Sequence, residues 1–139
     1  MNRIYISLMA LVSVLALGGC SMLQPRPPEE IIADRALAQA RHLINKEYDL
    51  ALTYVVPSYQ DSARATFYEA DYSGSATWTD ASVAWVRCDE ALEPDRCEVR
   101  LWVYGGPAAP RGSSRADNEP FVLQRVWIKI NGKWYQFLD

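Results

Sequence analysis

The feature that most constrains the fold of this 139-residue chain is a change in hydrophobic period near residue 76. Before it, apolar residues recur at helical spacing: Ile32, Ala36, Ala40, Leu43 and Ile44. After it, residues 76–88, 96–104, 121–130 and 133–138 are rich in Val, Ile, Trp and Tyr and alternate in part, as strands do. Helices followed by strands predict an α+β fold with an antiparallel sheet of about four strands.

Proline, glycine and asparagine residues indicate where the predicted helices and strands begin and end. Pro28 followed by two glutamates is typical of a helix start. We expect a second helix over about 48–55, stopped by Pro57, and a third over 62–70. The dipeptide Asn131-Gly132 predicts a hairpin between the last two strands, because both residues tolerate positive φ. Residues 105–120 form a long loop rich in Gly and Pro.

The N-terminus has the pattern of an export signal. Arg3 precedes an uncharged apolar run over residues 4–17, which is shorter than the about 20 residues of a membrane-spanning helix. The next residues, Leu17-Gly18-Gly19-Cys20, resemble the lipobox of bacterial lipoproteins. An ordinary secretory signal that happens to contain a cysteine is the alternative.

The lipoprotein resemblance implies a membrane anchor at Cys20, carrying a diacylglycerol and a further acyl chain. Several chains anchor a protein stably, whereas one holds it only marginally. Ser21 after the cysteine matches the sorting pattern for the outer membrane, with the domain facing the periplasm. We therefore divide the chain into a signal peptide (1–19), a lipidated, Pro-rich tether (20–30) and a periplasmic domain (31–139).

The charge and length of the chain limit the classes of partner and the number of domains. Removal of residues 1–19 takes away one charged residue, Arg3, and moves the net charge from −3 to −4. An acidic domain has no electrostatic reason to bind nucleic acid. The remaining chain of about 120 residues suffices for one compact domain.

Two cysteines remain once Cys20 is assigned to lipid. Cys88 and Cys97 flank a turn-like loop between two predicted strands, so a cross-strand disulfide is expected in an oxidising compartment. A metal site is the alternative, but two cysteines and His42 do not make a four-ligand shell. A redox pair is more often spaced C-x-x-C.

Two segments resemble the NTF2-like (cystatin-like cone) superfamily. They are NKEYDLALTYVVPSY, residues 45–59, and the closing hairpin RVWIKINGKWYQFL, residues 125–138. The resemblance implies helices packed on a curved antiparallel sheet, often paired through its sheet into a homodimer. The chain departs from the common plan, because no strand separates its second and third helices and only four strands are clear. These departures put the usual deep ligand pocket in doubt.

Strand alternation assigns the side chains to two faces. The predicted core face contains Cys97, Val99, Leu101 and Val103, together with Ala84, Val86, Cys88, Val126, Ile128 and Ile130. Lys129 lies on the opposite face with the candidate partner-binding residues: Trp85, Arg87, Arg100, Trp102, Tyr104, Arg125 and Trp127. Aromatic and arginine residues are enriched in interface hot spots. The alternative is that these side chains only cover each other's apolar stems, or that this face is the core face.

No catalytic motif is present. The sequence has no G-x-S-x-G or H-E-x-x-H motif and a single histidine, so we assign no catalytic residue, cofactor or metal ligand. We expect a non-catalytic module that binds a periplasmic protein or a second copy, and enzymatic activity is left open. The alternative is a cone whose pocket holds a small apolar ligand, with isomerase-like activity.

Overall fold

The computed structural model describes residues 25–106 and 119–139. The export signal, Cys20 and most of the 105–120 loop lie outside these residues. The described elements are α2 (Pro28–Ile44), α3 (Tyr48–Leu52), α4 (Pro57–Gln60), η1 (Ala63–Phe67), α5 (Tyr68–Tyr72), η2 (Ser73–Thr77), β1 (Trp78–Cys88), β2 (Arg96–Gly105), β3 (Phe121–Ile130) and β4 (Lys133–Gln136). Within the two described ranges, no helix is both long and apolar enough to cross a membrane.

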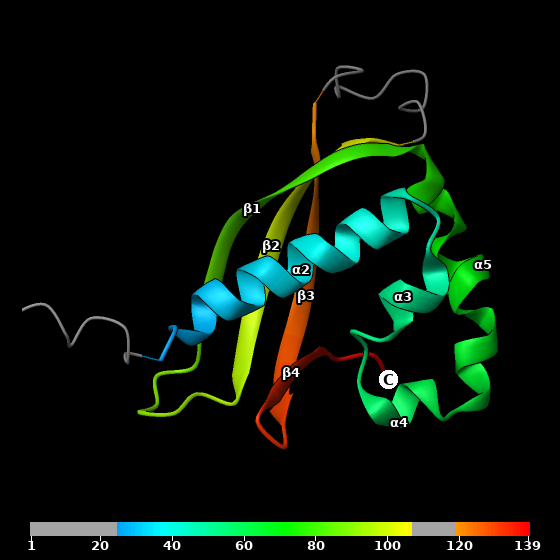
Figure 1. The fold of residues 1–139 in the computed structure, drawn as a ribbon. Helices are drawn as coiled ribbons and strands as arrows, with labels where there is room; N and C mark the ends of the chain where they lie inside the picture. Colours follow the sequence, from blue (N-terminus) through cyan, green and yellow to red (C-terminus); the bar gives the residue numbers. More distant parts are fainter. Residues whose placement is uncertain (1–24, 107–118) are drawn as a thin grey trace, which may run out of the picture.

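Helix α2 begins where the sequence predicts. Pro28 occupies its first turn with two glutamates after it, an arrangement that suits the positive end of the helix dipole. The helix crosses one face of the sheet and packs mainly on β1 and β2 (Figure 1). Its buried residues include Ile32, Ala36 and Ala40. The small alanines allow the helix to lie close to the strands.

The sheet has four antiparallel strands in the order β1-β2-β3-β4. Asn131 (φ 49°) and Gly132 (φ 80°) form the turn between β3 and β4, as predicted. Strand β1 has two register shifts, one of them between Val83 and Trp85. Such bulges bend a strand and increase its twist, and β1 is visibly curved over α2 (Figure 1). The predicted fold class, helices packed on a curved sheet of about four strands, is confirmed.

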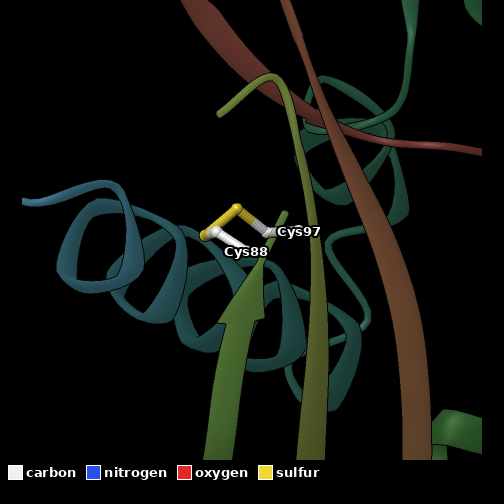
Figure 2. Close-up of a disulfide and its surroundings, with 2 residues drawn as sticks. All are labelled: Cys88 and Cys97. Carbon is white, nitrogen blue, oxygen red and sulfur yellow. A yellow bond between two sulfur atoms is a disulfide. The ribbon is translucent and has the colours of Figure 1, made fainter. Parts of the chain in front are cut away.

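The structure joins Cys88 and Cys97 in a disulfide between β1 and β2. The two residues face each other directly in the register of the strands, at the end of the hairpin (Figure 2). Cys97 is buried in the core beneath α2, and Cys88 packs against that core. The pair therefore closes the loop that the sequence placed between two strands.

Two hydrophobic clusters hold the elements together. The first joins α2 to the inner side of the sheet and includes Trp127 and Trp134. The second joins the end of α2 to α3, α4 and α5. The segment between α3 and α4 also pairs with the free edge of β4: the Val56 amide donates to the Gln136 carbonyl (3.0 Å), and the Gln136 amide donates to the Tyr54 carbonyl (2.7 Å). This pairing covers a sheet edge that would otherwise present open hydrogen-bonding groups.

The middle helices are shorter than predicted. The second ends at Leu52, and Pro57 starts α4 as well as preventing any continuation of α3. The third predicted helix, over 62–70, is a 3₁₀ turn followed by α5, which continues to Tyr72. Proline at the first helical position explains the new start, since its missing N–H has no partner to lose there.

Candidate functional site

The two faces of β2 divide as the alternation predicts. Cys97, Val99 and Val103 are at most 1% exposed and lie under α2. Trp102 and Tyr104 point to the opposite, outer face and remain 38% and 37% exposed. Strand β2 thus has one closed face and one open face.

Strand β1 extends the outer face. Trp85 lies opposite Arg100, and Arg87 lies opposite Glu98, so both lie on the face predicted for them. Ala84 has no partner on β2, because it forms the bulge, and Val83 instead lies opposite the buried Leu101. A bulge adds one residue to a strand and reverses the alternation beyond it.

Strand β3 is assigned to the wrong faces in the sequence analysis. Trp127 lies opposite Cys97 and is 0% exposed, and Arg125 lies opposite Val99. Both residues are therefore on the inner face, and so is Lys129, which pairs with Trp134. Lys129 is exposed and Arg125 is half-buried, whereas the Trp127 indole between them is covered. Neither Arg125 nor Trp127 belongs to the candidate outer surface.

The residues predicted as the core of β3 move to the other face. Val126 lies opposite Glu98, and Ile128 lies opposite Arg96. Ile128 and Ile130 are partly buried against the second cluster, so their apolar role is correct although their face is not. Alternation counted from the start of the strand, with Phe121 and Leu123 inside, would have given the observed faces.

This correction adds a residue that the sequence analysis missed. Val122 lies directly opposite Trp102 and is 45% exposed. Together with the β1 and β2 residues it defines what we call the outer aromatic face: Trp85, Arg87, Glu98, Arg100, Trp102, Tyr104, Val122 and Gln124.

Two arginines stack on one tryptophan in the outer aromatic face. The guanidinium carbons of Arg87 and Arg100 lie 4.4 and 5.0 Å from the centroid of the Trp85 ring. Cation–π attraction of this kind contributes on the order of 1 kcal/mol. The shared ring holds the guanidinium groups of Arg87 and Arg100 next to each other. Neither arginine forms an ion pair within the described residues.

A polar bridge continues the face from β2 to β3. Arg100 donates from Nη2 to Oε1 of Gln124 (3.3 Å), and Gln124 donates from Nε2 to Oε2 of Glu98 (3.3 Å). The Nε of Arg100 is buried and has no hydrogen-bond partner in the part of the chain that the structure describes. A donor left in this state is costly.

The interior of the cone is filled. Among the described residues, the cavity between α2, α5 and strands β2, β3 and β4 has a volume of about 10 Å³, which is about what one water molecule needs. Polar side chains occupy the centre: Gln39 donates from Nε2 to Oε1 of Gln136 at 2.6 Å, and Gln136 donates to the hydroxyl of Tyr72 at 3.4 Å. This space does not admit a small apolar ligand.

The interior also lacks paired acids. Among the residues that line the small cavity, Arg125 alone is charged. Burial raises the pKa of Tyr68, whose hydroxyl lies 3.4 Å from Nε2 of Gln39, so the tyrosine stays neutral. Within the described ranges, no group of three or more His, Cys, Asp or Glu side chains could hold a metal ion.

His42 has a local partner rather than a place in the interior. Its Nδ1 lies 2.7 Å from Oε2 of Glu47, and its ring lies 5.8 Å from that of Tyr54. The side chain is therefore a partly packed residue at the end of α2.

No protein-family model matches the chain. No curated protein sequence matches it either. Several solved structures are similar in shape. A SEC-C motif containing protein from Psychrobacter arcticus superposes with a TM-score of 0.55 at 12% identity, over 83% of this chain and 63% of that one.

Two others have lower scores. An NTF2-like transpeptidase from Campylobacter jejuni, described as putative, gives 0.46 at 14% identity, over 76% of this chain and 96% of that one. A SEC-C motif containing protein from Rhodopseudomonas palustris gives 0.48 at 17% identity, over 80% and 75%. At these identities only the fold is shared, and the chain spans less than two thirds of the first protein. The helices and curved antiparallel sheet implied by the NTF2-like resemblance are the arrangement observed.

Proposed function

We propose that this protein is a lipid-anchored periplasmic lipoprotein of the outer membrane that binds another protein through its outer aromatic face. The anchor is Cys20, and the domain acts without catalysis. The lipobox resemblance supports the anchor, and the two unlike faces of the sheet support the binding role.

One contrast carries the proposal. The interior, where a cone-shaped domain would hold a ligand, keeps about 10 Å³ of space, whereas Trp102, Tyr104 and Val122 stay exposed on the outer side. Exposed aromatic residues beside ordered arginines have the composition of binding hot spots. This contrast favours the binding role over the small-ligand alternative.

Charge indicates which kind of protein would bind. Arg87 and Arg100 lie together on Trp85 without a carboxylate partner among the described residues. Pairing with the same face of a second copy would bring the arginines of both copies together. An acidic surface with an apolar centre would neutralise them instead, so the expected partner is a different protein of this character.

Photo-crosslinking tests the interface. A benzophenone amino acid replaces Trp102 in cells that carry the anchored protein, and the adduct is identified by mass. Phe67 is the matched control, because it is also aromatic and is 62% exposed, but it lies among the helices. We expect an adduct from position 102 and none from position 67. No adduct from position 102, in a correctly anchored protein, would contradict the proposal.

The anchor has its own test. Cys20→Ser should abolish labelling by radioactive palmitate and release the domain from the membrane fraction. Unchanged labelling and fractionation would refute lipidation at Cys20 and leave the outer-face proposal intact.

A further inference from the structure

A second candidate site lies away from the outer aromatic face. A groove of about 580 Å³ opens between the N-terminal half of α2, the segment after α3 and the β3–β4 hairpin. This volume is within the usual range for small-molecule sites. Three aromatic side chains contribute to its walls: Tyr54, Trp134 and Tyr135.

Arg35 is held in place in this groove. Its Nε donates to the backbone carbonyl of Trp134 (2.8 Å), and its guanidinium carbon lies 4.9 Å from the centroid of the Tyr54 ring and 5.9 Å from that of Tyr135. These contacts use one nitrogen and the flat face of the group. The two Nη atoms remain available as a fork for an anionic oxygen pair.

The groove is cationic. Four basic side chains line it and no acidic one does. Arg26 is engaged by Glu30 and Asp34. Arg35, Lys129 and Lys133 form no ion pair within residues 25–106 and 119–139. Lys129 lies with its Nζ 5.9 Å from the centroid of the Trp134 ring, so it and Arg35 both gather around this tryptophan.

We propose that this groove binds a phosphate group, with Arg35 as the fork and Lys129 and Lys133 as point charges. Three unneutralised cations suit a group that carries about −1.5 to −2 charges better than a single carboxylate. Lysine recognises phosphate as a point charge, and arginine recognises it through two parallel hydrogen bonds. The aromatic walls would contact the remainder of the molecule.

Two sources of phosphate are compatible with this chemistry. Pro25 lines the groove, and Cys20 precedes it by five residues, which span at most about 18 Å when fully extended. A lipid anchor at Cys20 would therefore keep the groove near phospholipid headgroups. That source rests on the proposed anchor, whereas binding of a soluble phosphate compound does not.

The test uses the full chain, labelled with ¹⁵N, in non-ionic detergent. Inorganic phosphate is titrated in, and the amide signals of Gly132, Lys133 and Trp134 are followed by NMR. Acetate at matched ionic strength is the control anion. Lys129→Gln combined with Lys133→Gln removes two exposed charges and leaves the Arg35 contacts intact. A further variant, Arg35→Gln, removes the arginine fork of the groove. Its matched control is Arg41→Gln, because Arg41 lies on the same helix, is exposed and does not line the groove.

Phosphate should give saturable shifts, and the lysine double variant should weaken binding by about five- to tenfold. Arg35→Gln should weaken it further, and Arg41→Gln should leave it unchanged. Three results would each overturn the proposal: no saturable shift, an equal response to acetate, or an unchanged affinity in the double variant.

A second experiment distinguishes a lipid headgroup from a soluble phosphate compound as the ligand. The same titration is repeated in nanodiscs of phosphatidylcholine with and without phosphatidylglycerol. If the anionic lipid produces the groove shifts and blocks added phosphate, a headgroup is the ligand. If added phosphate binds equally in nanodiscs with and without phosphatidylglycerol, the ligand is a soluble phosphate compound. Failure of the outer-face crosslink would leave either result unaffected.

Discussion

The inner and outer faces of the sheet contain the same kinds of side chain and use them differently. On the inner face, Trp127 is 0% exposed, and the guanidinium carbon of Arg35 lies 6.0 Å from its ring centroid. On the outer face, Trp85 carries two stacked arginines and is only partly buried. Residue type therefore does not decide between core and surface here. The position of α2 does.

The difference also concerns polar groups. Inside, the two glutamines bond to each other at 2.6 Å. Outside, the bonds of Gln124 to Arg100 and Glu98 are longer, at 3.3 Å, and the Arg100 Nε has no partner within the described residues. Each face also holds one buried donor without a partner among the described residues, Trp127 Nε1 inside and Arg100 Nε outside. The two faces therefore differ in the closeness of their side-chain bonds and not in the number of unpartnered donors.

The largest expected effect is the difference in unfolding free energy between a tryptophan substitution on the inner face and one on the outer face. Trp127→Ala should lower the free energy of unfolding by about 3–5 kcal/mol, because it leaves a cavity in the core. Trp102→Ala should lower it by about 1 kcal/mol or less, since its side chain is already partly exposed. Urea unfolding followed by circular dichroism measures both. Equal losses would mean that the outer face is also a core face.

The disulfide should have the next largest effect. Replacing both Cys88 and Cys97 by alanine should cost about 2–3 kcal/mol, because the loop between them is no longer closed in the unfolded chain. Urea unfolding under non-reducing conditions gives the value. If reducing agent lowers the stability of the native chain and leaves the double variant unchanged, the loss belongs to the bond itself. A free thiol at either position in the native chain would contradict the pairing.

The interior pair of glutamines should behave as a unit. Gln39→Leu leaves Oε1 of Gln136 without its donor and should cost about 1–3 kcal/mol. Gln39→Leu combined with Gln136→Leu should recover part of this loss, since no buried polar atom of the pair is then left alone. A double-mutant cycle in urea measures the coupling. Simple additivity would show that the two side chains act independently.

The smallest expected effect on stability is on the outer face. Arg100→Ala removes the stacking on Trp85 together with the unpartnered Nε, so the free energy of unfolding should change by about 1 kcal/mol or less. The same variant should clearly reduce the crosslink yield from position 102. An unchanged yield would remove Arg100 from the interface. A large loss of stability would instead give it a structural role.

Local signals in the sequence predict much of this fold. Pro28 marks the start of α2, and Asn131-Gly132 marks the hairpin turn, because each is required by the backbone at its position. The cysteine pair also gave the correct register of β1 on β2, since a cross-strand bond requires opposed positions.

The faces of β3 were assigned wrongly, and the bulge in β1 was not predicted. Val126, Ile128 and Ile130 suggested the core face of β3, whereas the pairing with β2 and β4 places Arg125 and Lys129 on the inner face. The bulge at Ala84 adds one residue without any glycine or proline to signal it. The phosphate groove depends on residues from three separate elements, which only the tertiary structure brings together.

Hydroxyl-radical footprinting tests the central claim most directly. The oxidation of Trp102 and Tyr104 is compared between native membranes and the purified protein, with Phe67 as the exposed control and Trp127 as the buried one. We predict that Trp102 and Tyr104 are protected in the membrane, that Phe67 reacts equally in both samples, and that Trp127 reacts little in either. Equal oxidation of Trp102 and Tyr104 in both samples would show that no partner covers the outer aromatic face.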